Sequence, residues 1–161
     1  MPSISVVSLI AGESKEGLSN SLTCVENSIE ELSNEGVPSQ NIVVIGISQR
    51  GVLTIYTALY TKYKIGAFIP IVGWLPLRKV EPIFKLPMLV NKEPQILQVQ
   101  GKLDICVSYI ATTKTKKDME KIFTNYTIEV ASFWGYETAQ IIKRGAIKRL
   151  LKDNTKLKFE R

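Results

Sequence analysis

The sequence contains no histidine among its 161 residues. Histidine is the usual general base of serine and cysteine hydrolases, so its absence argues against an intact Ser-His-Asp or Cys-His mechanism. The two cysteines, Cys24 and Cys106, do not form a Cys-x-x-Cys pair, which argues against a zinc site. The apolar runs are short, and none approaches the ~20 residues of a membrane-spanning helix.

The first residues carry neither a basic leader nor a long apolar stretch. We therefore read no signal peptide and expect a cytoplasmic, reduced protein. Hydrophobic residues make up 45% and charged residues 22%, which is typical of a globular chain. This length fits one domain, so we expect residues 1–161 to form a single unit.

The net charge of +6 is concentrated at the end of the chain. Residues 1–80 hold six basic and six acidic groups, whereas the last 21 hold eight basic and two acidic groups. Basic and apolar residues alternate over 141–152, which predicts an amphipathic helix with a solvated cationic face. Weak contact with an anionic membrane stays open, and no nucleic-acid partner is expected because no binding signature accompanies the charge.

Strands and helices are predicted to alternate along the chain. A period of 3.6 residues predicts helices, and short apolar, β-branched runs predict buried strands. Such alternation predicts an α/β fold, with a mostly parallel sheet of about four strands and helices on both faces. The predicted helices cover 21–35, 52–63 and 108–125, and the predicted strands cover 41–46, 65–72, 96–101 and 127–133.

The segment from Ile42 to Gly51 places a serine, Ser48, between a predicted buried strand and a helix, with Gly46 two residues before it. This is the context of a nucleophile elbow, in which a sharp turn exposes the serine hydroxyl above the sheet. A serine at this point can equally well cap the following helix. The pattern alone leaves both interpretations open.

The wider sequence resembles the acyl-protein thioesterases, of the phospholipase/carboxylesterase family of α/β-hydrolases. The segment Gly-Ile-Ser-Gln-Arg-Gly from Gly46 resembles the family's Gly-Phe-Ser-Gln-Gly-Gly. The segment Gly-Trp-Leu-Pro from Gly73 resembles Ser-x-Trp-Leu-Pro, and Gln-Val-Gln-Gly-Lys-Leu-Asp from Gln98 resembles Gln-x-His-Gly-x-x-Asp. These similarities follow one another in the family's order.

The resemblance implies the C-terminal part of an α/β-hydrolase, and it implies a role for several residues. Ser48 would be the nucleophile, Asp104 the acid of the triad, and the N–H of Gln49 one oxyanion donor. Trp74 and Leu75 would lie at the acyl-binding groove. The family cleaves palmitoyl thioesters on cytoplasmic proteins and small acyl esters, and it needs no cofactor or metal.

The sequence departs from the family where catalysis depends on it most. Thr138 stands where the family has its catalytic histidine, and loss of that residue costs on the order of a million-fold in kcat. The family's opening strands and its first oxyanion loop have no counterpart before Met1, so we expect a truncated domain with impaired catalysis. The alternatives are a non-catalytic relative that binds an acyl chain or a partner, and an adaptor whose basic tail binds anionic surfaces.

Overall fold

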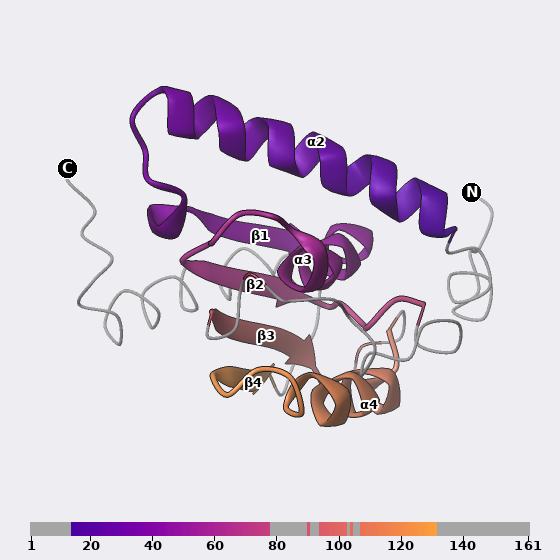
Figure 1. Ribbon diagram of the computed structural model, residues 1–161. Coiled ribbons are helices and arrows are strands. Elements are labelled where there is room, and N and C mark those ends of the chain that lie inside the picture. Colours follow the sequence, from indigo (N-terminus) through magenta and orange to yellow (C-terminus); the bar gives the residue numbers. More distant parts are fainter. Residues whose placement is uncertain (1–13, 78–89, 91–93, 103, 105–106, 132–161) are drawn as a thin grey trace.

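The computed structural model describes residues 14–77, 90, 94–102, 104 and 107–131 (Figure 1). Their strands form one sheet in the order β1-β2-β3-β4, and each neighbouring pair is parallel. This confirms the predicted α/β fold with a parallel sheet. The elements are α2 (Lys15–Asn34), a 3-10 helix η1 (Ser39–Asn41), β1 (Val43–Ile47), α3 (Gln49–Tyr60), β2 (Ala67–Ile71), β3 (Gln95–Gly101), α4 (Tyr109–Met119) and β4 (Tyr126–Ala131).

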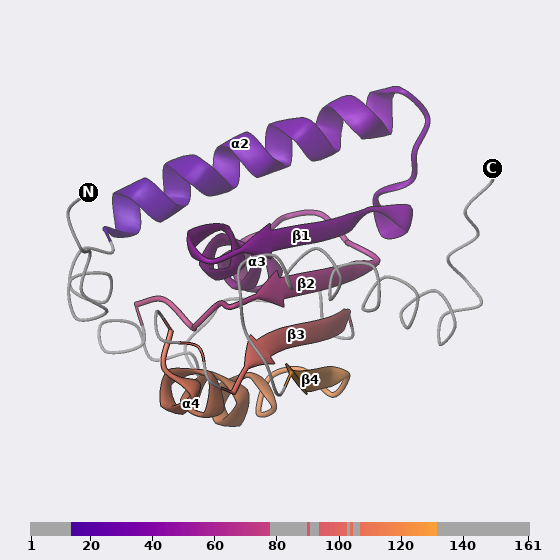
Figure 2. The same ribbon diagram turned by 180° about the vertical axis from the view of Figure 1, so that it is seen from behind.

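The strands run in the same direction, so their carboxyl ends meet at one edge of the sheet (Figure 2). The register aligns the ends closely. Ile47 of β1 lies opposite Ile71 of β2, and Ile71 lies opposite Val99 of β3. The segments that follow these strands therefore emerge side by side, which is where parallel α/β sheets place their ligands.

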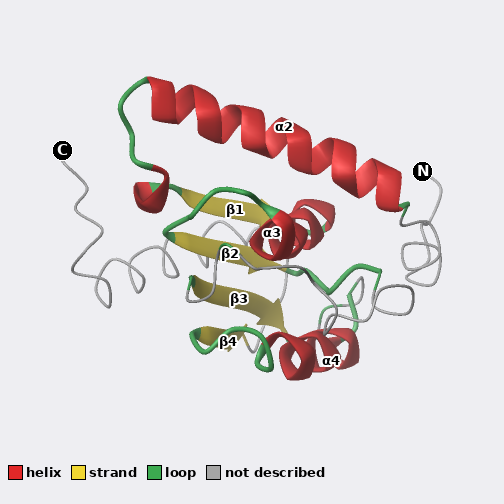
Figure 3. Ribbon diagram, in the orientation of Figure 1, coloured by secondary structure: helices red, strands yellow, loops and turns green. Residues whose placement is uncertain are grey.

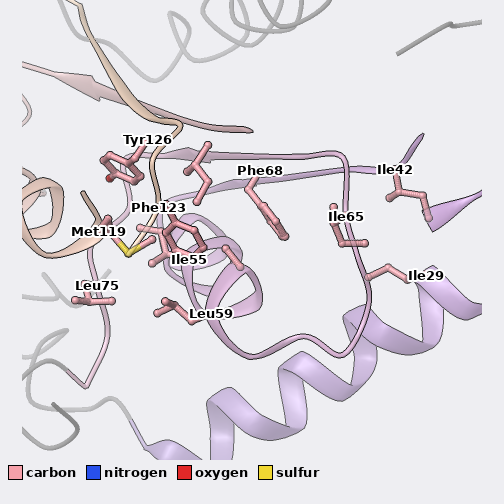
Figure 4. Close-up of a cluster of buried hydrophobic side chains, with 12 residues drawn as sticks. Ile29, Ile42, Ile55, Leu59, Ile65, Phe68, Leu75, Met119, Phe123 and Tyr126 are labelled. Carbon is pink, nitrogen blue, oxygen red and sulfur yellow. The ribbon is translucent and has the colours of Figure 1, made fainter. Parts of the chain in front are cut away.

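Side chains of both sheet faces are buried. Successive residues of a strand point to opposite faces, so Phe68 and Ile69 belong to different sides of the sheet. Phe68 packs with α3 and with the end of α4 in one cluster (Figure 4), and Ile69 packs in a second cluster with Val99. Figure 3 shows α3 in front of the strands and α4 beside β3 and β4. Burial on both faces is expected of a parallel sheet.

β1 is less buried than its sequence predicts. Its apolar run was expected to be covered on both faces, yet Val43, Val44 and Ile45 are only half-buried. Within the described residues β1 pairs on one side only, with β2, whereas β2 and β3 each lie between two strands. The side chains of β2 are buried throughout. The position of a strand in the sheet therefore determines this difference.

Helix α2 begins six residues earlier than predicted. The sequence pattern predicts a start at Ser21, but Ser14 caps the helix by accepting a hydrogen bond from the N–H of Gly17 at 2.9 Å. Its end is as predicted, because Gly36 adopts a φ of 94° directly after the cap residue. Ile29 is its one buried residue. None of the described helices is long and apolar enough to cross a membrane.

Helix α3 also begins and ends earlier than predicted, at Gln49 and Tyr60 rather than at 52 and 63. Its end is set by α2. The Glu26 carboxylate accepts hydrogen bonds from the Thr61 hydroxyl at 3.0 Å and from the Lys62 N–H at 2.8 Å. These contacts hold the chain in an extended conformation after Tyr60. Because they join residues about 35 positions apart, no local pattern reveals them.

Candidate active site

Three of the segments named by the sequence analysis leave the sheet at its carboxyl edge. Ser48 follows β1, Trp74 and Leu75 follow β2, and Asp104 follows β3. Adjacent strands of a sheet lie about 5 Å apart, so β1 and β3 are about 10 Å apart. The fold therefore places the predicted nucleophile and the predicted acid on the same edge, with the predicted acyl-binding segment between them.

Ser48 has an unusual backbone conformation, with φ 57° and ψ −120°. Non-glycine residues rarely adopt positive φ, and such strain gathers at functional sites. The Ser48 N–H donates to the Ile71 carbonyl at 2.9 Å, which fixes the turn against β2. Although Ser48 stands at the N-cap of α3, its side chain makes no capping hydrogen bond. The capping interpretation is therefore wrong, and Ser48, which is half-buried, lies at the carboxyl edge of the sheet.

Two glycines make this sharp turn sterically feasible. A Cβ atom on Gly46 would collide with the carbonyl of Arg50 and would lie 2.5 Å from the Thr54 Oγ1. A Cβ on Gly51 would lie 2.6 Å from the Ile71 carbonyl oxygen. Contacts this short require the backbone to shift. The start of α3 therefore packs directly against β1 and β2, and glycine is required at both positions.

Gln49 is the first residue of α3, and its side chain is exposed. A backbone N–H in the first turn of a helix has no acceptor within the helix. The positive end of the helix dipole adds to this donor capacity and favours negative charge nearby. The backbone beside Ser48 therefore has the electrostatic character that an oxyanion site needs.

Trp74 and Leu75 are buried, with 8% and 5% of their surface exposed. Leu75 belongs to the first cluster and Trp74 to the second. Leu75 also donates its N–H to the Thr115 Oγ1 at 2.8 Å. The segment after β2 is thus packed into the protein on both sides, and it is held in a defined position next to the Ser48 turn.

Asp104 lies in a turn that its own carboxylate stabilises. Its Oδ1 accepts the N–H of Val107 at 2.8 Å, and its N–H donates to the Gly101 carbonyl at 3.4 Å. The side chain is half-buried. One oxygen of the carboxylate is therefore used to shape the loop after β3, an arrangement that fixes the orientation of the group.

Two buried glutamines of β3 were missed as site residues by the sequence analysis. Gln98 and Gln100 are fully buried. Gln98 Nε2 donates to the Gly73 carbonyl at 2.8 Å, and Gln100 Nε2 donates to the Val107 carbonyl at 3.2 Å. They therefore support the segment after β2 and the loop after β3. Their spacing of two residues within an apolar strand was the available signal, since buried amides need partners.

Burial also governs the ionisation of Tyr126, whose hydroxyl donates to the Oε1 of Gln98. Its pKa is raised well above the ordinary range for tyrosine, first by burial and then by the negative charge of Glu120. Tyr126 therefore stays neutral and remains a donor at ordinary pH.

Some predicted features lie outside the described residues. These are the segment 134–138, which includes Thr138, and the basic helix predicted over 141–152. One pocket, whose lining includes Tyr109, Lys116 and Val130, lies between α4 and β4. β4 is the last strand in the order of the described sheet, whereas Ser48 follows β1, the first. That pocket contains no residue of the predicted site.

Sequence comparison identifies relatives over most of the chain. The sequence pattern of the Phospholipase/Carboxylesterase family matches residues 3–139. Acyl-protein thioesterase 1 of Kluyveromyces lactis is 28% identical over 120 residues, which cover 74% of this chain and 52% of that protein. An acyl-protein thioesterase 1 homolog of Dictyostelium discoideum is 42% identical over 60 residues, which cover 37% and 27%. The chain thus spans about half the length of the Kluyveromyces relative.

Solved structures show the same fold. SOBER1 of Arabidopsis thaliana superposes with a TM-score of 0.65 at 21% identity, over 86% of this chain and 66% of that one. A phospholipase/carboxylesterase of Dyadobacter fermentans gives 0.62 at 18% identity, over 83% and 65%. The fold, the order of the motifs and the family match agree, and the chain belongs to the phospholipase/carboxylesterase family of α/β-hydrolases.

Proposed function

We propose that this chain is an acyl-protein-thioesterase-type serine hydrolase domain whose catalytic turnover is strongly impaired. The observation that carries the proposal is the strained turn at Ser48, where a positive φ and two close-packed glycines present a serine that does not cap its helix. A protein keeps a strained serine in this geometry when the surrounding structure over-determines it. The proposed substrates are palmitoylated proteins or small acyl esters in the cytoplasm.

In this proposal Ser48 Oγ attacks the carbonyl carbon of the acyl group, forming a carbon–oxygen bond. The thiolate or alkoxide of the substrate then leaves, and water later releases the acyl group from the serine. The Gln49 N–H would stabilise the negative oxygen, and Asp104 would occupy the place of the family's triad acid. Because the sequence holds no histidine, the Ser48 proton would pass to water. The residues around Trp74 and Leu75 would contact the acyl chain.

The impairment follows from the residues available. The serine proton must be accepted as the new bond forms, and the sequence holds no histidine to accept it. Thr138, which stands at the family's histidine position, has a hydroxyl that cannot act as a base near neutral pH. We therefore expect turnover far below that of an intact triad, together with retained recognition of the acyl group.

Covalent labelling tests this proposal. A fluorophosphonate reacts when Ser48 Oγ bonds to phosphorus and fluoride leaves, so intact mass reports the adduct. We expect slow labelling of the wild-type chain and none of Ser48→Ala. The matched control is Ser108→Ala, because Ser108 also stands at a helix N-cap but its hydroxyl caps α4. A folded chain with no Ser48-dependent adduct would contradict the proposed nucleophile.

Without an adduct, saturable binding of a fluorescent C16 fatty acid would instead support a non-catalytic, acyl-binding relative. A separate arm concerns the basic residues 143–161. Salt-sensitive binding to phosphatidylserine vesicles that is lost on deletion of these residues would support membrane contact through the tail.

A further inference from the structure

Helix α4 supports both segments that flank the candidate site, one by a direct hydrogen bond and the other through a side chain of β3. Thr115 Oγ1 accepts the N–H of Leu75 at 2.8 Å, and Thr112 Oγ1 donates to the Gln100 Oε1 at 2.9 Å. Gln100 in turn holds the Val107 carbonyl. Both threonines are buried. One helix therefore supports the predicted acyl-binding segment directly and the Asp104 loop through a single side chain.

The segment after β2 is held at two backbone atoms by two different elements. Gln98 of β3 binds the Gly73 carbonyl, while Thr115 of α4 binds the Leu75 amide. Gly73 also packs against Gly51, since a Cβ on Gly73 would lie 2.8 Å from the Gly51 carbonyl carbon. The backbone that carries Trp74 is therefore fixed relative to α3, and hence relative to the Ser48 turn.

The position of these polar groups distinguishes them from ordinary core residues. Their β3 neighbours Ile96, Leu97 and Val99 are apolar, and apolar residues at 98 and 100 would avoid the cost of burying amides. The two glutamines and Thr115 bond instead to backbone atoms of residues 73–75 and 107. Buried polar networks of this kind select one conformation from several of similar packing.

We propose that Thr115 and Gln98 are positioning residues that set which acyl chains the site accepts, by fixing the backbone of residues 73–75. The inference rests on the proposed function for its ligand, the acyl chain. It goes further by assigning acyl-chain selection to two residues that bind the backbone of residues 73–75. Loss of either hydrogen bond lets the segment shift, which changes the fit of a long chain more than that of a short one.

The test compares Thr115→Val with Thr115→Ser and Thr113→Val. Valine matches threonine in shape but cannot accept the Leu75 N–H, whereas serine can. Thr113 is the matched control, because it lies on the same helix but its hydroxyl bonds to the helix's own Tyr109 carbonyl at 2.7 Å. Hydrogen exchange of the peptide 72–77 should accelerate at least tenfold in Thr115→Val and stay unchanged in the other two variants.

The second readout is selectivity, which a purely structural role would not change. We compare labelling rates with a hexadecyl and an ethyl fluorophosphonate. In Thr115→Val the ratio of the hexadecyl to the ethyl labelling rate should fall at least fivefold, because the hexadecyl rate falls while the ethyl rate does not change. Thr115→Ser should keep the wild-type ratio. An unchanged ratio would overturn the proposal even if exchange accelerates, and unchanged exchange would overturn it as well.

Failure of the proposed nucleophile is distinguishable from failure of this inference. If neither probe labels the wild-type chain, the nucleophile assignment fails, and selectivity is then read from the affinities of fluorescent C16 and C8 fatty acids. A fivefold loss of C16 preference in Thr115→Val supports the inference. Equal preference in wild type and variant contradicts it.

Discussion

The turns after β1 and after β3 reach the same edge of the sheet but are stabilised in different ways. The turn at Ser48 is held by close backbone packing, in which Gly46 and Gly51 leave no room for a side chain. The turn at Asp104 is held by hydrogen bonds. Its own carboxylate accepts the Val107 N–H, and the amide of the buried Gln100 donates to the Gly101 and Val107 carbonyls. The Ser48 turn depends on the absence of side chains at two glycines, whereas the Asp104 turn depends on buried polar groups that are hydrogen-bonded.

The two kinds of support should fail differently. A steric support tolerates no added atom, because the contacts are between backbone atoms that cannot rotate away. A polar support tolerates a change of shape but not the loss of a partner, since an unpaired buried group costs about 1–3 kcal/mol. The two kinds of support can therefore be compared by adding a methyl group at a glycine and by removing one partner of a buried hydrogen bond.

The largest effect is expected from Gly46→Ala. The new methyl group would collide with the Arg50 carbonyl and Thr54 Oγ1, so the start of α3 must move. We expect the free energy of unfolding to fall by at least about 3 kcal/mol. Urea denaturation measures it. The control is Gly36→Ala, which has φ 94° but no atom within 4 Å of the added carbon and should cost about 1 kcal/mol. Equal losses would contradict a steric origin.

Gln100→Met should have the next largest effect. Methionine fills a similar volume but leaves the Thr112 hydroxyl and the Val107 carbonyl without their glutamine partner. We expect a loss of about 2 kcal/mol and faster hydrogen exchange at Val107, with the peptides of α3 unchanged. Exchange mass spectrometry and urea denaturation together check this. If the Ser48 turn loosened equally, the two turns would not be independently supported.

Tyr126→Phe tests the hydrogen bonds of the other buried glutamine of β3, Gln98, through their pH dependence. At pH 7 the variant should lose about 1 kcal/mol, because the Gln98 Oε1 loses a buried donor. The pKa of Tyr126 is raised in the folded chain, so above about pH 10 the unfolded chain releases a proton that the folded chain retains. Wild-type stability therefore falls as pH rises through this range, by up to about 1.4 kcal/mol per unit.

Because phenylalanine does not titrate, the stability difference between wild type and Tyr126→Phe should narrow above pH 10. Urea denaturation at pH 7, 9, 10 and 10.5 measures it. A difference that stays constant across this range would show that Tyr126 ionises equally in both states.

The contrast also explains what the sequence could reveal. The pattern of the Ser48 turn was visible in the sequence because it is local, with two glycines and a serine between a strand and a helix within six residues, and only the choice between an elbow and a helix cap was left open. The network behind Asp104 was not visible, because Gln100 and Thr112 come from different elements and meet only after the sheet has formed. The early end of α3 has the same origin, since Glu26 acts from another helix.

The position of each strand in the sheet could likewise not be predicted from its own residues. The apolar runs of β1 and β2 look alike in the sequence, yet β2 is fully buried and β1 is half-buried, because the described part of β1 has one neighbour. The parallel direction of the strands could be predicted from their alternation with helices. The number of neighbours that each strand has could not.

The smallest expected effect isolates the strain at Ser48. Its φ of 57° costs an L-residue about 1 kcal/mol but costs glycine little, so Ser48→Gly should be more stable than Ser48→Ala. Glycine is also a better N-cap than alanine, and this preference must be subtracted. The control is therefore the pair Ser108→Gly and Ser108→Ala, because Ser108 is an N-cap with an unstrained φ of −56°. We expect the glycine-minus-alanine difference in unfolding free energy to be about 0.5–1 kcal/mol larger at position 48. Equal differences would mean that the turn stores no strain, and that the glycines alone hold Ser48 at the sheet edge.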